Sequence, residues 1–166
     1  LIEDGRPSFG LVYAPARALL AVTTAKGEAV AAELPANASG ADLSQLHRST
    51  LRARAANKEG LTALVSLSHL DPVTEAFLAK LKIAERSGVG SSVKFVTLAK
   101  GEADVYPRFA PTMEWDTAAG QAVLTRAKVI EAELRHARND VQTIQGAQIG
   151  EIRVSASPTV AMGLLP

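Results

Sequence analysis

One stretch, residues 88–124, constrains the fold more than any other part of this sequence, because glycine and proline divide it into short units. Apolar periodicity and breaker residues predict, in order, a turn at 88–92, a helix at 91–100, a strand at 103–107, a proline-bounded loop and a helix from 116 onward. Strands and helices that alternate over such short connections are typical of an α/β fold.

Two of these units are suited to charged ligands. Gly90, Ser91 and Ser92 precede a predicted helix, where free backbone N–H groups and the positive end of the helix dipole favour phosphate. Lys94 and Arg108 supply charged donors nearby in the sequence. These residue types indicate an anion site.

Asp116 lies at the predicted start of the following helix. A carboxylate in that position either caps the helix or binds Mg²⁺. The simpler alternative is that Ser91 and Asp116 are only helix caps and that Trp115 belongs to the core. The spacing alone leaves both interpretations open.

Three blocks in this stretch carry a family resemblance. GVGSSVKF, GEADVYPRF and PTMEWDTAAGQAVL resemble the C-terminal half of bacterial 3′(2′),5′-bisphosphate nucleotidases, which belong to the inositol monophosphatase superfamily. The resemblance implies a layered α/β sandwich and a magnesium-dependent phosphatase of sulfur metabolism that acts on 3′-phosphoadenosine 5′-phosphate. It implies Asp116 as a metal ligand. The substrate contacts that it implies are Gly90, Ser91, Ser92, Lys94, Arg108 and Glu114.

The same resemblance also predicts what this chain lacks. In the family, an Asp-Pro-x-Asp-Gly-Thr motif supplies two metal ligands and a Glu-Glu pair lies further upstream, and neither motif occurs in these 166 residues. We therefore expect a chain that binds its substrate but does not hydrolyse it by itself. An inositol phosphate is the alternative substrate, although the YPR and SSVKF segments favour a nucleotide.

The remaining pattern up to residue 127 predicts one mixed sheet with helices packed against it. Strands are expected within 8–34, 61–67 and 85–89, and a helix is expected at 71–82. Asp4-Gly5 and Lys26-Gly27 are turn dipeptides that predict hairpins. Residues 35–60 are polar and rich in alanine, which predicts a solvated connection.

The C-terminal stretch from Val129 to Pro166 resembles a different family. It is similar to the linker helix and the first effector-domain strand of LysR-type transcriptional regulators. We therefore expect a phosphatase part at 1–127 and a second part at 128–166, with one long helix from 117 to 145 and a short strand-helix tail. A two-heptad seam predicts helix pairing. Its positions are Ile130, Leu134, Ala137, Val141 and Ile144.

Composition excludes several other classes of function. The net charge is +1, which argues against bulk nucleic-acid binding, and the sequence contains no cysteine. No apolar run reaches the roughly 18 residues of a membrane span. We expect a cytoplasmic location, with peripheral attachment to the inner membrane as an alternative. A fragment of a regulator and a dimerising interaction module are the alternatives to a phosphatase.

Overall fold

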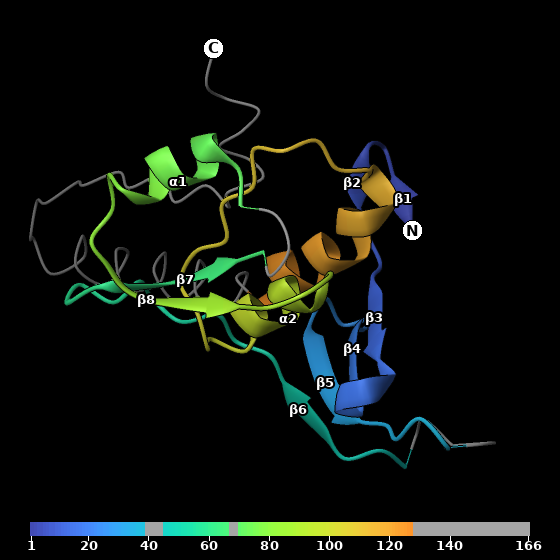
Figure 1. Ribbon diagram of the computed structural model, residues 1–166. Helices are drawn as coiled ribbons and strands as arrows, with labels where there is room; N and C mark the ends of the chain where they lie inside the picture. The colour runs from blue at the N-terminus through green and yellow to red at the C-terminus, as the bar shows by residue number, and fades with distance from the viewer. Residues whose placement is uncertain (39–44, 67–69, 128–166) are drawn as a thin grey trace, which may run out of the picture.

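The computed structural model describes residues 1–38, 45–66 and 70–127, and these residues confirm the α/β class. An antiparallel sheet lies at one side of the molecule, a parallel strand pair lies at the other, and two helices lie between them (Figure 1). The single mixed sheet expected from the sequence is wrong. The segment between the two sheets, residues 51–60, contains no strand, and the two sheets do not join.

The chain begins with a short hairpin made of β1 (Ile2–Glu3) and β2 (Arg6–Pro7). Asp4 and Gly5 connect the two strands with φ angles of 49° and 71°. Positive φ at both central residues is the geometry of the hairpin turn that an Asp-Gly pair favours. The prediction of a turn at this dipeptide is confirmed.

Four strands form the antiparallel sheet in the order β3-β4-β5-β6. They are β3 (Leu11–Ala14), β4 (Leu19–Thr23), β5 (Ala29–Glu33) and β6 (Arg48–Thr50). The register aligns Val12 with Ala21 and Ala21 with Ala31, and all three side chains are buried in the same core. The strand β6 corrects the prediction that 35–60 is only a connection. Its three residues are exposed, so they carry no apolar pattern from which a strand is predicted.

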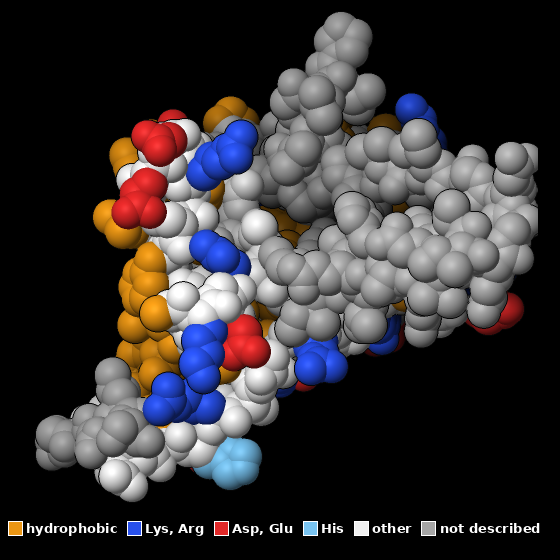
Figure 2. Space-filling model, turned by 180° about the vertical axis from the view of Figure 1, so that it is seen from behind, with side chains coloured by type: hydrophobic (Ala, Val, Ile, Leu, Met, Phe, Trp, Pro, Cys, Tyr) orange, Lys and Arg blue, Asp and Glu red, His pale blue; other side chains and the backbone are white. Residues whose placement is uncertain are grey.

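The outer face of β3 is apolar and exposed. Phe9 just before the strand is 44% exposed, and Leu11 and Tyr13 within it are 48% and 37% exposed. Figure 2 shows hydrophobic side chains along the edge of the molecule where this strand lies. A strand was expected within 8–34, and in β3 the smaller residue, Val12, is the one that faces the core.

The parallel pair consists of β7 (Leu61–Val65) and β8 (Ile83–Gly88), joined through helix α1 (Pro72–Leu78). Asp71 caps α1, because its carboxylate accepts the Thr74 N–H at 2.9 Å. The helix is shorter than the expected 71–82. The strand expected at 103–107 is reduced to a single parallel bridge between Ala63 and Val105, on the other side of β7 from β8.

The two central helices are α2 (Val93–Ala99) and a helix that covers residues 114–127 and begins two residues earlier than expected. They approach closely at Gly120. A Cβ atom there would lie 2.6 Å from the ring of Phe95, so only glycine permits this contact. The predicted long helix to residue 145, the seam from Ile130 to Ile144 and the strand-helix tail lie outside the described residues.

Candidate functional site

The main candidate site is a cavity of about 290 Å³ at one edge of the parallel strands. Ser66 follows β7, Ser91 follows β8 after a short turn, and Tyr106 follows the bridge at Val105. These strands are parallel, so their carboxyl ends meet at this edge, which is where ligands bind in open α/β sheets. The lining residues are Ser66, Ser91, Ser92, Lys94, Phe95, Tyr106, Arg108, Thr112, Trp115, Asp116 and Thr117.

Most of the residues predicted from the sequence lie around this one cavity. Ser91, Ser92 and Lys94 come from the start of α2, and Arg108 and Asp116 come from segments that follow it in the chain. Gly90 and Glu114 were also predicted as substrate contacts. Gly90 precedes the turn and Glu114 is exposed at the first position of its helix, and neither residue lines the cavity.

Lys94 is the most unusual residue of the cavity, because it is a lysine with only 4% of its surface exposed. Its Nζ atom lies 4.9 Å from the centre of the Tyr106 ring and 3.4 Å from the Ser91 carbonyl oxygen, to which it donates. Burial lowers the pKa of Lys94 below its usual value, and the positive charge of Arg108 lowers this pKa further. A buried cation with so few partners favours an anionic ligand.

Arg108 faces the same cavity as a second cation. Its terminal nitrogen donates to the Pro111 carbonyl oxygen at 3.4 Å. The Nε atom is buried and has no hydrogen-bond partner among the described residues. A buried donor without a partner is uncommon in native proteins. Lys94 and Arg108 together therefore provide donors suited to phosphate oxygens.

The conformations of Ser91 and Ser92 contradict the interpretation of Ser91 as only a helix cap. Ser91 has a φ of 58°, in the left-handed region, and Ser92 takes the cap position of α2 without a side-chain hydrogen bond. Neither hydroxyl caps the helix, so the alternative that assigned Ser91 only a capping role is wrong. Left-handed backbone at a non-glycine residue is strained and is often found at functional sites.

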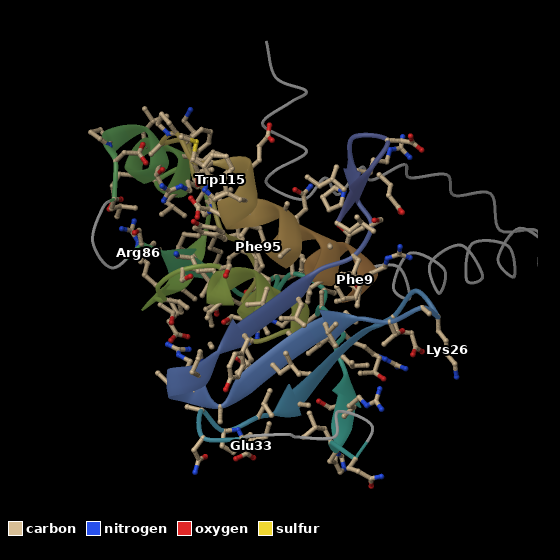
Figure 3. The ribbon with its side chains drawn as sticks, turned by 90° about the vertical axis from the view of Figure 1, so that its right-hand side faces the viewer. Phe9, Lys26, Glu33, Arg86, Phe95 and Trp115 are labelled. Atoms are coloured by element: carbon tan, nitrogen blue, oxygen red, sulfur yellow. The ribbon has the colours of Figure 1, made fainter. Side chains whose placement is uncertain are left out.

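Two further expectations, Asp116 as a helix cap and Trp115 in the core, are wrong. Asp116 lies in the first turn of its helix rather than at the cap, and its backbone N–H donates to the Met113 carbonyl oxygen at 3.1 Å. Trp115 is 76% exposed, so it does not belong to the core. Figure 3 shows Trp115 at the start of this helix, and it also labels Phe95 of α2, which packs against the helix at Gly120. Both the carboxylate and the indole are therefore available at the cavity.

The donor set does not fit a complete magnesium centre. No group of three or more His, Cys, Asp or Glu side chains in the described part of the chain is arranged to hold a metal ion. Among the described residues that line this cavity, Asp116 is the single carboxylate. Mg²⁺ demands near-octahedral oxygen coordination, and one carboxylate supplies only a small part of it.

Sequence reasoning missed the aromatic residues of the cavity and three of its hydroxyl groups. Tyr106 stacks edge-on against Phe95 at 5.8 Å between ring centres, and it also carries Lys94 on its face. Ser66, Thr112 and Thr117 add hydroxyl groups to the lining. The position of Tyr106 directly after an extended segment is the one sequence signal that indicates it, because strand ends carry ligand sites.

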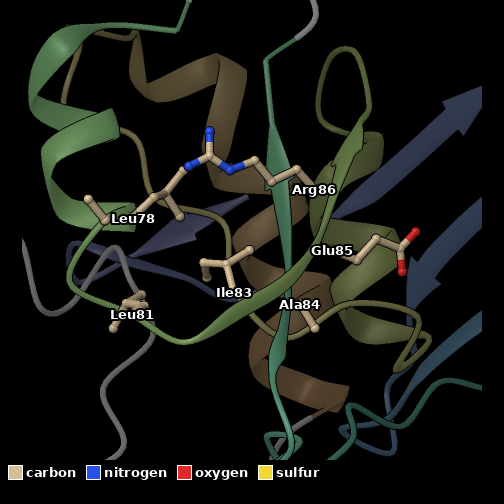
Figure 4. Close-up of a pocket in the computed structure, with 7 residues that line it drawn as sticks. Leu78, Leu81, Ile83, Ala84, Glu85 and Arg86 are labelled. Carbon is tan, nitrogen blue, oxygen red and sulfur yellow. The ribbon is translucent and has the colours of Figure 1, made fainter.

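A second hollow, of about 390 Å³, lies between α1 and β8 (Figure 4). Apolar residues such as Leu78, Leu81 and Ile83 line it together with the charged residues Glu85 and Arg86. The charged group of Arg86 on its rim is engaged by Glu75 through hydrogen bonds of 2.8 and 3.0 Å. No residue predicted for catalysis or binding lies there, so this hollow is not the candidate active site.

The fold agrees with the comparison to known proteins. Residues 1–143 match the inositol monophosphatase family, and the chain belongs to this family. The match extends past residue 127, where the resemblance to a LysR-type regulator was expected to begin. The division at 127/128 and that second resemblance stay predictions.

Relatives make the similarity more specific. Over 127 residues the chain is 35% identical to the 3′(2′),5′-bisphosphate nucleotidase CysQ of Escherichia coli strain K12, covering 76% of this chain and 46% of the relative. Over 52 residues it is 62% identical to an uncharacterized protein in the pss 5′ region of Rhizobium leguminosarum bv. phaseoli, covering 31% of this chain and 55% of that protein.

A solved structure supports the same fold. The chain resembles the crystal structure of CysQ from Bacteroides thetaiotaomicron, with a TM-score of 0.62 and 33% identity over 75% of this chain and 49% of that one. The chain therefore spans about half the length of the nucleotidases that it matches. Within the described ranges, no helix is both long and apolar enough to cross a membrane.

Proposed function

We propose that this chain carries the substrate-binding part of a magnesium-dependent 3′(2′),5′-bisphosphate nucleotidase that acts on 3′-phosphoadenosine 5′-phosphate. One observation carries the proposal: the buried cation Lys94 and the donor-rich Arg108 line one cavity with two serines and a carboxylate. The similarity to relatives named as bisphosphate nucleotidases supports the same substrate class.

The residues take different roles in this proposal. Lys94 and Arg108 bind phosphate oxygens through charge-assisted hydrogen bonds, and the hydroxyls of Ser91 and Ser92 add donors beside them. Trp115 presents an exposed indole at the cavity, and an aromatic ring in such a place suits stacking with a nucleobase. This indole and the two cations favour a nucleotide bisphosphate over an inositol monophosphate.

Enzymes of this family are generally metal-dependent. Bound Mg²⁺ would supply activation of water and neutralisation of charge on the leaving oxygen. Asp116 is the proposed metal contact from this chain, and the remaining oxygen ligands would come from phosphate, water and carboxylates that the described residues do not supply. We therefore propose that these 166 residues bind the nucleotide without hydrolysing it. We also propose that the nucleotide is bound in the cytoplasm.

Titration of the ¹⁵N-labelled chain, followed by NMR, tests the proposal. Adenosine 3′,5′-bisphosphate, which is another name for 3′-phosphoadenosine 5′-phosphate, should shift the amide signals of Ser91 and Ser92 and the side-chain signal of Arg108. It should also bind more tightly than inositol 1-phosphate. Lys94→Met should abolish these shifts, whereas Lys100→Met should leave them unchanged, because Lys100 is exposed beyond the end of α2. Equal binding by the Lys94→Met variant would contradict the proposed site.

A further inference from the structure

We infer that Arg54 and Asp104 form a clamp that positions Tyr106 and Arg108 at the cavity, a role that rests on the proposed function of that cavity. The Arg54 guanidinium donates two hydrogen bonds to the two carboxylate oxygens of Asp104, at 2.9 and 2.8 Å. A further bond of 3.2 Å from Arg54 reaches the hydroxyl of Thr62. The side chain of Asp104 is 1% exposed, whereas that of Arg54 is 39% exposed.

Asp104 also fastens its own segment to strand β7. Its carboxylate accepts the Thr62 backbone N–H at 2.7 Å, and its backbone N–H donates to the Thr62 carbonyl oxygen at 2.9 Å. One residue later, the Val105 carbonyl oxygen accepts the Leu64 N–H at 2.8 Å. The chain from residue 104 to residue 105 is thus tied to β7 through both its side chain and its backbone.

Two residues that line the cavity, Tyr106 and Arg108, lie close to Asp104 along the chain. Tyr106 lies two residues beyond Asp104, and Arg108 lies four residues beyond it. The segment forms a single bridge rather than a regular strand, so within the described part of the chain no ladder of backbone bonds holds the residues after Val105. Their placement against Phe95 and Lys94 therefore depends on how firmly Asp104 is held.

The burial of the pair separates it from an ordinary surface ion pair. Arg86 and Glu75 form a comparable pair whose side chains are both 43% exposed, and it lies at the other hollow. Exposed pairs of this kind contribute little, whereas a buried carboxylate needs all of its hydrogen bonds. This bidentate contact requires arginine, because the lysine ammonium group lacks the planar fork of donors that matches a carboxylate.

Matched substitutions in the two pairs test the clamp in the full chain. Asp104→Asn and Glu75→Gln make the same chemical change, and both variants are titrated with adenosine 3′,5′-bisphosphate by NMR. Asp104→Asn should weaken binding about tenfold, and Glu75→Gln should change it less than about twofold. Arg54→Lys keeps the charge and is the milder variant if Asp104→Asn does not fold. It should weaken binding by an intermediate amount.

A double-mutant cycle distinguishes positioning from a general loss of structure. In an Arg108→Met background, Asp104→Asn should weaken binding further by less than about twofold, because the clamp acts through Arg108. Full additivity, or unchanged affinity of folded Asp104→Asn, would overturn the clamp. If the parent chain does not bind the nucleotide, the proposed function fails instead. The clamp then still predicts a displaced Arg108 Nε–H signal in Asp104→Asn, and an unchanged signal would overturn it.

Discussion

The antiparallel sheet and the cavity are built on different principles. In the sheet, backbone ladders pair β3 to β6 and the inner face carries small apolar residues such as Ala21 and Ala31. At the cavity, a buried lysine, a strained serine and a buried arginine nitrogen lie close together. The first arrangement favours stability, whereas the second sacrifices stability for binding. Substitutions in the two regions should therefore affect different measurements.

The largest effect on stability should come from the core face of β3. Val12→Ala removes buried methyl groups and should lower the free energy of unfolding by about 2 kcal/mol, because the core cannot fully close the gap. Leu11→Ala on the exposed face of the same strand is the control and should change it by less than about 0.5 kcal/mol. Denaturant unfolding measures both. The nucleotide affinity of the folded Val12→Ala protein should stay unchanged. A loss of affinity would contradict the separation of stability in the sheet from binding at the cavity.

Lys94→Met should change the free energy of unfolding in the opposite direction. This substitution removes a buried charge and retains the apolar length of the side chain, so the free energy of unfolding should rise by about 1 kcal/mol. The same variant should lose phosphate binding. Denaturant unfolding and a phosphate titration on one sample check both parts. A destabilised variant would show that Lys94 supports the fold rather than the ligand.

The lowered pKa of Lys94 predicts a pH effect that sharpens this result. Between the folded-state pKa and the unfolded value of 10.5, the unfolded chain binds more protons, so the free energy of unfolding should rise with pH through that window. Phosphate affinity should fall over the same window, because the neutral amine no longer attracts the anion. Lys94→Met should remove both trends, and identical pH profiles in the two proteins would contradict the assignment.

The smallest effect should come from the strained turn. Ser91→Gly relieves the left-handed backbone, and it should raise the free energy of unfolding by only about 0.5 kcal/mol, because glycine also gains freedom in the unfolded chain. Thermal unfolding is sensitive enough to detect this change. Gly90→Ala is the neighbouring control, because a Cβ atom there meets no other atom within 4 Å. A destabilised Ser91→Gly protein would show that the serine hydroxyl holds the turn.

The sequence predicted the local elements where a short-range rule determines them. The Asp4-Gly5 turn follows from one dipeptide, and α2 (Val93–Ala99) lies within the helix expected at 91–100. The α/β class and five residues of the cavity were also predicted, because glycine, serine and charged residues gather in one stretch.

Long-range contacts were not predictable in the same way. Trp115 was assigned either to a motif or to the core, and its exposure depends on how its helix packs, for example at the contact of Gly120 with Phe95. The pair formed by Arg54 and Asp104 joins residues 50 positions apart, and Arg54 lies in a segment that reads as a solvated connection. The strand β6 is exposed throughout, so its pairing with β5 leaves no pattern in the sequence.

The most direct test of the account is a ³¹P NMR spectrum of adenosine 3′,5′-bisphosphate mixed with this chain and Mg²⁺. We predict that the phosphate signals of the nucleotide shift and broaden in proportion to the protein, while no inorganic phosphate accumulates. Inorganic phosphate that accumulates with this chain and is absent with the Asp116→Ala variant would contradict binding without hydrolysis. Phosphate signals that do not respond to the protein at all would contradict the binding site itself.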